Sequence, residues 1–452
     1  MRDQGVAIEA RARRKWTVVL SVAVALIGLV VPSLASAATV ELTPGQTAQF
    51  DTNLAVPPLP PKLDFAFVFD TTGTMSGEVS NAKFGATSFF NAVRADSADS
   101  MFGVASFEDY PYSTFGNSAG MDPDSPYRRN TDLTASLGTW QTAVNSLSIR
   151  NGGDAPEAQV PAMDAAMTGS ALTWPTGSTA AGQGISFRDG VPHVIALVSD
   201  GSFHNDSTGS DAYNFTAPTY AQTLAALAAK DVRVIAADSS GLPDEADMLG
   251  IAADTNGIHT RFNTNGTALY DGIFNVSQSP GITKALHLLT WPVTRQLSCD
   301  PLQASIDSSS WASVAGSAML PYTETISAPP QLSVADLPAS GTVDCVVDFL
   351  WDGLKIAEQH TDVHVTLPTP DTQITKGPKK KTKKKKATFE FSSTVAGSTF
   401  ECKLDDGPFE PCTSPHDVKA KKGKHSFEVR ATAGGQTDPT PATDSWKVKK
   451  KK

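Results

Sequence analysis

Residues 63–78 read LDFAFVFDTTGTMSGE, and this stretch decides the fold that we expect. Its first seven residues are mostly apolar, and Asp70 follows them directly, with hydroxyl side chains at Thr72 and Thr74. A short apolar run rich in Phe and Val is typical of a strand buried in a parallel sheet. A carboxylate followed by two hydroxyls, at the end of such a strand, predicts a cluster of hard oxygen atoms. Such oxygen atoms suit Mg²⁺ or Mn²⁺.

Strand-like and helical patterns alternate from residue 61 to residue 279. The further strands are expected at Met101–Phe107, Val191–Ser199, Val232–Ala237 and Ile258–Phe262. The further helices are expected at Thr134–Leu147, Ala155–Met167, Tyr220–Ala229, Asp244–Ala253 and Thr267–Val276. Because such alternation is typical of a doubly wound parallel sheet, we expect an α/β, Rossmann-like domain over residues 61–279.

Strand patterns without helices flank this region. Residues 280–367 contain strands only, so a β-sandwich is expected there, and the hairpin-like strands of residues 38–60, which are too few to fold alone, could complete it. If the two segments combine, the α/β domain is an insertion in the sandwich; separate domains in a row are the alternative. Residues 368–387 are predicted to be a Lys-rich linker, and residues 388–452 a small β domain with a basic tail.

Residues 1–37 indicate in which compartment the protein is found. Residues 1–37 have a basic start, an apolar run over residues 17–31 and the small-residue sequence Ala35-Ser36-Ala37, which is the pattern of a secretory signal peptide. A membrane anchor is the alternative, although the apolar run is shorter than the ~20 residues that a span usually needs. We therefore expect an extracellular protein, either secreted or associated with the cell surface.

Four cysteines permit three pairings. Proximity within the expected domains favours Cys299 with Cys345 and Cys402 with Cys412.

The charge of the chain is divided unevenly. The net charge of −10 combines an acidic body with a basic segment that begins near Asp371. An acidic body argues against nucleic acid as its partner. The run KKKTKKKK at residues 379–386 is interpreted as a solvated linker or as a site for anionic cell-envelope polymers.

Three separated motifs resemble the metal site of von Willebrand factor A domains, in particular those of the integrin β-like branch. They are Asp70-x-Thr72-x-Thr74, the loop Gly152-Gly153-Asp154-Ala155-Pro156-Glu157, and Asp200 followed by Phe203-His204. The resemblance implies that Thr72, Thr74 and Glu157 bind Mg²⁺ (or Mn²⁺) directly, and that Asp70 and Asp200 hold it mainly through water. It also implies a second site for Ca²⁺ at Asp109, Asp154 and the carbonyl group of Pro156.

The resemblance implies a function in adhesion rather than catalysis. A coordination position of the cation is left for an acidic group of a partner, so a protein with an exposed Asp or Glu is the expected ligand. The C-terminal module is similar to the immunoglobulin-like repeats of exported bacterial proteins.

Two alternatives remain open. One is an accessory metal-dependent hydrolase, which needs a general base, and Glu157 and His204 are the candidates. The other is a structural cell-envelope protein anchored by its Lys-rich module. The sequence contains no His-Glu-x-x-His, Gly-x-Ser-x-Gly or Walker motif, and this favours a protein without enzymatic activity.

Overall fold

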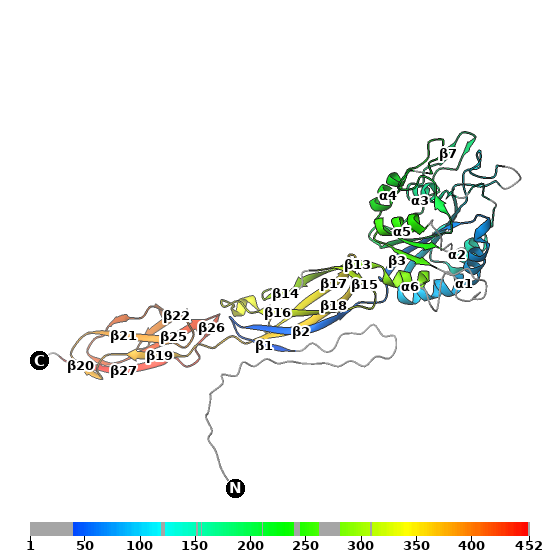
Figure 1. Cartoon of the computed structure of the whole chain (residues 1–452). Coiled ribbons are helices and arrows are strands. Elements are labelled where there is room, and N and C mark those ends of the chain that lie inside the picture. Colours follow the sequence, from blue (N-terminus) through cyan, green and yellow to red (C-terminus); the bar gives the residue numbers. More distant parts are fainter. Residues whose placement is uncertain are drawn as a thin grey trace, which may run out of the picture.

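The computed structural model describes residues 39–118, 123–150, 152–154, 156–209, 211–238, 245–261, 281–307 and 310–450. The predicted leader of residues 1–37 and the predicted helix of residues 267–276 lie outside these residues. Figure 1 shows three folded parts in a row: a mixed-sheet domain (residues 57–289), a sandwich domain (residues 39–56 and 290–368) and a C-terminal module (residues 369–450). The molecule is therefore elongated, with the mixed-sheet domain and the C-terminus at opposite ends.

The mixed-sheet domain is built on six strands in the order β12-β11-β9-β3-β4-β5. All neighbouring pairs are parallel except β4 and β5, which are antiparallel. The strands are β3 (Lys62–Asp70), β4 (Asp99–Phe107), β5 (Arg128–Thr134), β9 (His193–Ser199), β11 (Val232–Asp238) and β12 (Ile258–Arg261). The parallel strands end at the same edge of the sheet, which is where the predicted metal ligands lie.

Strand β3 lies inside this sheet and connects its two faces. Because side chains alternate along a strand, Phe65, Phe67 and Phe69 join one apolar core, whereas Ala66 and Val68 join the other. Three helices contribute to the phenylalanine face: α1 (Ser76–Asp96), α2 (Leu137–Asn145) and α6 (Ile282–Leu288). The opposite face is covered by α3 (Gln159–Thr168), α4 (Tyr220–Ala229) and α5 (Glu245–Asp254).

The prediction of an α/β chain organised by a doubly wound parallel sheet is wrong. Strands make up 42% of the structure and helices 19%, so the chain is mostly β. Most of its sheets are antiparallel or mixed, and the six-stranded sheet itself is mixed because of β5. The physical reason is that residues 63–279 carry the strongest apolar pattern, whereas many of the other strands are short or half-exposed and give a weak pattern.

Two elements illustrate this error. No strand was predicted at β5, because all seven of its residues are half-buried and show no alternation of polar and apolar side chains. Helix α6 lies in a region that was expected to contain strands only. Its residues Ile282, Ala285 and Leu286 are buried against the mixed sheet, so tertiary packing decided its conformation.

The sandwich domain is made from both sides of the mixed-sheet domain. Strand β2 (Thr47–Ala55) pairs with β16 (Met319–Ser327), and β1 (Val40–Leu42) pairs with β18 (Leu354–Val365). Its other strands are β13 (Thr290–Ser298), β14 (Gln303–Ile306), β15 (Trp311–Ala315) and β17 (Thr342–Trp351). A short 3-10 helix occupies Val334–Asp336, and a disulfide joins Cys299 to Cys345. The mixed-sheet domain is thus inserted between strands of one sandwich.

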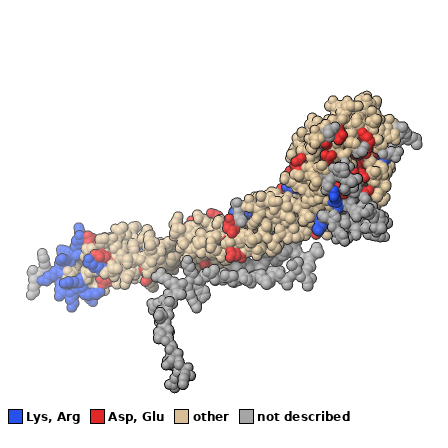
Figure 2. Space-filling view, viewed as in Figure 1, with Lys and Arg blue, Asp and Glu red and all other residues tan. Residues whose placement is uncertain are grey.

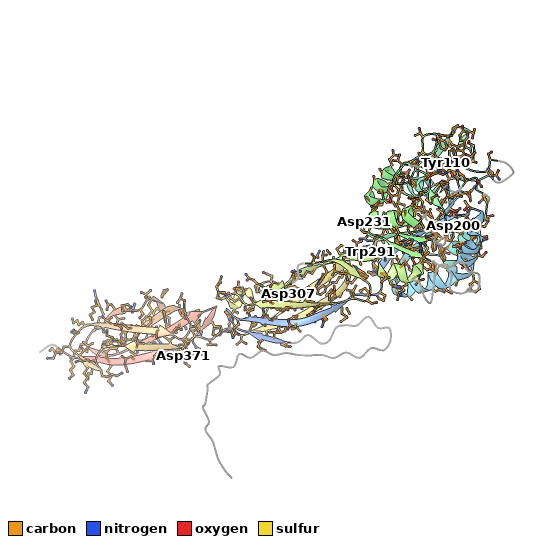
Figure 3. The ribbon with its side chains drawn as sticks, in the orientation of Figure 1. Tyr110, Asp200, Asp231, Trp291, Asp307 and Asp371 are labelled. Carbon is orange, nitrogen blue, oxygen red and sulfur yellow. A yellow bond between two sulfur atoms is a disulfide. The ribbon has the colours of Figure 1, made fainter. Side chains whose placement is uncertain are left out.

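The junction between these two domains is apolar. Trp291 and Trp351 are fully buried with their rings 5.6 Å apart, and they belong to the same core as the phenylalanine face of β3. The guanidinium group of Arg233, from β11, lies 5.0 Å from the Trp291 ring and donates to the carbonyl oxygen of Thr290. A shared core holds the two domains together. Figure 3 labels Trp291 where the two domains meet.

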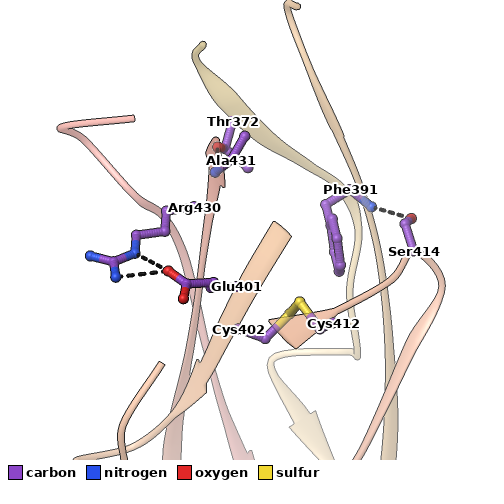
Figure 4. Close-up of a disulfide and its surroundings, with 8 residues drawn as sticks. All are labelled: Thr372, Phe391, Glu401, Cys402, Cys412, Ser414, Arg430 and Ala431. Carbon is purple, nitrogen blue, oxygen red and sulfur yellow. Dashed lines mark hydrogen bonds and ion pairs between the residues drawn. A yellow bond between two sulfur atoms is a disulfide. The ribbon is translucent and has the colours of Figure 1, made fainter. Parts of the chain in front are cut away.

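The C-terminal module contains two layers around Phe389, Phe427 and Trp446, and their strand pairs are antiparallel except for the parallel pair of β20 with β27. The first layer is β19 (Thr372–Lys376), β21 (Lys386–Ser393) and β24 (His416–Lys419). The second is β20 (Lys381–Thr382), β22 (Thr399–Leu404), β23 (Glu410–Cys412), β25 (Gly423–Ala433), β26 (Gln436–Thr437) and β27 (Ala442–Val448). Figure 4 shows the disulfide between Cys402 and Cys412, close to the ion pair of Arg430 with Glu401.

The segment of residues 368–387 differs from the expected linker. It contains β19 and β20, and Thr372 is buried. The hydroxyl of Thr372 accepts from the backbone N–H of Ala431, and its own backbone N–H donates to the carboxylate of Asp438. Strand β20 adds to β27, so its lysines belong to the folded module. A charge run without apolar periodicity gives no sign of such pairing.

Candidate functional site

The predicted ligands meet at the carboxyl edge of the mixed sheet. Asp70 ends β3, and Asp200 follows β9, which is its neighbour in the sheet. Thr72 and Thr74 lie in the turn that leads through a 3-10 helix (Gly73–Met75) into α1. Glu157 lies in β6 (Pro156–Glu157), which pairs with β10 (Ser202–Phe203) beyond Asp200. Three distant segments are thereby brought to one place.

Hydrogen bonds orient the carboxylate of Asp70, which is fully buried. Its Oδ1 accepts from the backbone N–H of Thr72 at 2.9 Å and from the Thr72 hydroxyl at 2.8 Å. Its Oδ2 accepts from the Ser199 hydroxyl at 2.7 Å, and Gln159 donates to that hydroxyl at 2.9 Å. Burial raises the pKa of Asp70 to about 7, although these hydrogen bonds act in the opposite direction.

Thr74 connects the first motif to the third. Its hydroxyl donates to Oδ1 of Asp200 at 3.0 Å. Asp200 is half-buried, and its charge contributes to the raised pKa of Asp70. Thr72 and Thr74 therefore hold one carboxylate each and keep oxygen atoms of both motifs together. Figure 3 places Asp200 within the mixed-sheet domain.

Glu157 is the most perturbed acid in the site. Its side chain is 6% exposed, and Oε2 is buried without a hydrogen-bond partner among the described residues. Burial raises its pKa to about 11, and the charges of Asp70, Asp109, Asp154 and Asp124 act in the same direction. An ionised Glu157 thus needs a positive charge close by.

Gly152 brings the backbone against this carboxylate. It has a φ of +63°, and a Cβ atom there would lie 3.0 Å from Glu157 Oε1 and 3.3 Å from Thr72 Cγ2. A side chain would therefore crowd the space that Glu157 and Thr72 share. Carboxylates, hydroxyls and an unpartnered buried oxygen fit a hard divalent cation such as Mg²⁺ or Mn²⁺.

The residues of the predicted calcium site lie beside a histidine. Asp109 is fully buried, and its Oδ1 accepts from the Tyr213 hydroxyl at 2.6 Å. His204 Nε2 lies 3.3 Å from Asp109 Oδ2 and 3.5 Å from Asp154 Oδ2, and the potential ligand atoms of these three residues lie within 4.8 Å of one another. Pro156 pairs with Ser202 in the β6–β10 ladder.

His204 brings a positive charge to the predicted calcium site. Burial alone lowers its pKa, but the hydrogen bond and charge of Asp109 outweigh burial and raise the pKa to about 9. An imidazolium group therefore stands between two of the residues expected to bind Ca²⁺. The calcium site stays a prediction, now with a competing cation supplied by the chain itself.

A buried group of ion pairs around Glu108 lies beside the site and was not predicted from the sequence. Glu108 is fully buried at the end of β4 and forms ion pairs with Arg128 and Arg150. It also accepts from the hydroxyl of Thr71, and the backbone N–H of Arg150 donates to the carbonyl oxygen of Thr71 at 2.8 Å. The position of Glu108, directly after a buried strand next to β3, is the signal that would have found it.

Ser199 and Gln159 were also missed, since a lone serine at a strand end and a glutamine in a helix are common. The aromatic side chains of residues 110–130 turn inwards: Tyr110 is fully buried, with its ring 4.8 Å from that of Tyr213. Phe115 packs edge-on against His204 at 5.2 Å. Tyr110 and Phe115 therefore pack around the cluster of Asp109, Asp154 and His204 and do not form an outer surface.

Comparisons with known proteins add little to this geometry. No family model matches the chain, and no curated protein matches it. Among solved structures, two structures of proximal thread matrix protein 1 from the mussel byssus are similar, with 13% and 15% sequence identity and a TM-score of 0.30. Each match covers 48% of this chain and 45% of the mussel protein, so the chain spans less than half of that protein. A TM-score this low supports no conclusion about fold or function.

Proposed function

We propose that this chain is an exported binding protein without enzymatic activity, which holds Mg²⁺ or Mn²⁺ and through it binds an acidic group of a partner protein. The observation that carries the proposal is the carboxylate of Glu157, which is buried among other acids and has one oxygen without a hydrogen-bond partner in the described part of the chain. Such a group is costly to bury unless a cation compensates it. The resemblance of the three motifs to integrin β-like A domains supports the same reading.

Each residue of the site has a distinct part in this proposal. Glu157 and the hydroxyls of Thr72 and Thr74 offer oxygen atoms to the cation, and Asp70 and Asp200 orient those hydroxyls. Ser199 and Gln159 fix the second oxygen of Asp70. The cation supplies a coordination position that an incoming carboxylate can take. Thr74 is exposed and Asp200 is half-buried, so a carboxylate of a partner can reach the site from their side.

The proposal that the chain is exported rests on less specific observations than the proposal of the metal site. Two disulfides indicate that the chain folds in an oxidising environment. Within the described residues, no helix has the length and apolar character to cross a membrane. Secretion itself depends on the predicted leader of residues 1–37, which lies outside the described residues.

The hydrolase alternative needs a general base, and of its two candidates Glu157 is assigned here to the cation, which leaves His204. Both ring nitrogens of His204 are engaged, since Nε2 faces Asp109 and Asp154 and Nδ1 lies 2.7 Å from the carbonyl oxygen of Asp211. A histidine held in this way is poorly placed to accept a proton from water. This geometry favours binding over hydrolysis.

Isothermal titration calorimetry of the full chain with Mg²⁺ and with Mn²⁺ tests the proposal. Glu157→Gln and Asp70→Asn are expected to lose cation binding, because each removes a charge and keeps the side-chain shape. Asp189→Asn is the matched control: Asp189 is exposed, and it precedes the amino-terminal end of β9, opposite the site. Equal cation affinities for the wild type and both site variants would refute the assignment.

A further inference from the structure

Three lysine-rich segments that are far apart in the sequence come together at one end of the C-terminal module. Register places Lys381 opposite Lys447 in the β20–β27 ladder, Lys386 opposite Lys419 in β21–β24, and Lys424 opposite Lys447 in β25–β27. Figure 2 shows the resulting concentration of positive charge at the tip of the molecule, away from the mixed-sheet domain. We name this tip the lysine pole; it consists of Lys379–Lys381, Lys383–Lys386, Lys419, Lys421, Lys422, Lys424, Lys447, Lys449 and Lys450.

The charge of the lysine pole is largely uncompensated. All its side chains are exposed, and the described residues supply ion pairs to only two of them. Lys380 pairs with Asp444 at 2.5 Å, and Lys386 pairs with Asp417 at 2.7 Å. Like charges opposite one another in a ladder destabilise a sheet, as at Lys381 and Lys447. A fold that carries such repulsion without compensation within the module points to a partner of opposite charge.

The shape and composition of the pole distinguish between anionic partners. The charges cap the end of a rod and do not form a stripe along its side, so they match a flat surface better than a linear polymer (Figures 1 and 2). Lysines are point charges without the planar fork of arginine, which reads phosphodiesters bidentately. Among the aromatic residues of the module, Phe389, Phe427 and Trp446 are buried and cannot stack on nucleobases. Phe409 is half-buried, and the guanidinium group of Arg430 lies 4.1 Å from the centre of its ring.

We propose that the lysine pole docks the chain end-on onto a bilayer rich in anionic phospholipid. The long axis then points away from the bilayer and presents the mixed-sheet domain at the far end. Clusters of four to eight basic residues are sufficient for recognition of anionic lipid. Each lysine near such a surface changes the partition coefficient about fivefold, which corresponds to ~1 kcal/mol. The proposal is independent of the metal site and stands if that site fails.

Co-sedimentation of the full chain with vesicles tests the docking. We expect binding to vesicles of phosphatidylglycerol and phosphatidylcholine in equal parts, and none to vesicles of phosphatidylcholine alone. The variant Lys421→Gln/Lys422→Gln/Lys424→Gln is expected to bind roughly a hundredfold more weakly. These three side chains are exposed and form no hydrogen bond or ion pair with the residues that the structure describes, so the variant is expected to keep its fold, which circular dichroism verifies. Salt at about 1 M, where the Debye length is ~3 Å, is expected to release the wild type.

The control variant Lys83→Gln/Lys230→Gln/Lys284→Gln removes the same charge from the mixed-sheet domain and is expected to bind like the wild type. Equal losses in both variants would overturn the proposal, because net charge and not the pole would then decide binding. Binding to soluble polyphosphate without binding to the anionic vesicles would assign the pole to a polymer and also overturn it. Neutron reflectometry on a supported bilayer of the same lipids is expected to give a layer as thick as the molecule is long; a thin layer would refute the end-on orientation.

Discussion

Replacing Glu157 with Gln gives the sharpest test of the site, because the variant keeps the side-chain shape and removes the charge. Burial, together with the charges of neighbouring acids, raises the pKa of Glu157 from its ordinary value of 4.5 to about 11. Between these two pH values, the unfolded chain releases a proton that the folded chain keeps. The free energy of unfolding of the wild type without metal therefore falls as pH rises through this window.

The size of this loss in the free energy of unfolding follows from the one proton that Glu157 keeps in the folded chain. The slope is about 1.4 kcal/mol per pH unit, so the wild type loses about 3 kcal/mol between pH 6 and pH 8 through Glu157. Glu157→Gln lacks this loss. For a domain of about 200 residues, the difference corresponds to a shift of roughly 5–10 °C in the unfolding temperature of the mixed-sheet domain.

Divalent cations are expected to stabilise the wild type more than Glu157→Gln. Saturation at about a hundred times the dissociation constant stabilises the wild type by about 2.7 kcal/mol, and the variant gains much less because it has lost a ligand. Differential scanning calorimetry at pH 6 and pH 8, in EDTA and in Mg²⁺, measures all four conditions. Equal pH slopes of the two proteins in EDTA would refute the electrostatic argument, and equal gains in Mg²⁺ would refute the ligand assignment.

Three further predictions concern the surroundings. Glu108→Gln is expected to lower the free energy of unfolding by about 3–5 kcal/mol in urea denaturation, because it leaves Arg128 and Arg150 without their buried partner; a loss below about 1 kcal/mol would contradict this. Replacing Cys299 and Cys345 with Ala should cost about 4 kcal/mol, since the disulfide closes a loop with a sequence separation of 46, and calorimetry of the sandwich transition checks it. Asp154→Asn should weaken Ca²⁺ binding at least tenfold in calorimetric titration and leave Mg²⁺ binding nearly unchanged; unaltered Ca²⁺ binding would remove the second site.

Parts of the fold followed from local patterns, and parts did not. The apolar run before Asp70 is a buried strand in the structure because its two faces both meet helices, and a continuous apolar pattern records this. Strand β5 gave no comparable pattern, since an edge strand with half-buried polar residues resembles a loop. The lysines of residues 379–386 read as a linker, although β20 pairs with β27 more than sixty residues later. These errors led to the wrong fold class.

The amino-acid sequence by itself determined which oxygen-bearing residues follow buried strands, because strand burial and turn chemistry are local properties recorded in the order of residues. Asp70, Thr72, Thr74 and Asp200 were found in this way. Only the tertiary structure decided the environment of Glu157, the position of His204 beside Asp109, and the meeting of three lysine segments at one tip. Burial, pKa and charge density depend on distances through space, and the order of residues along the chain does not contain those distances.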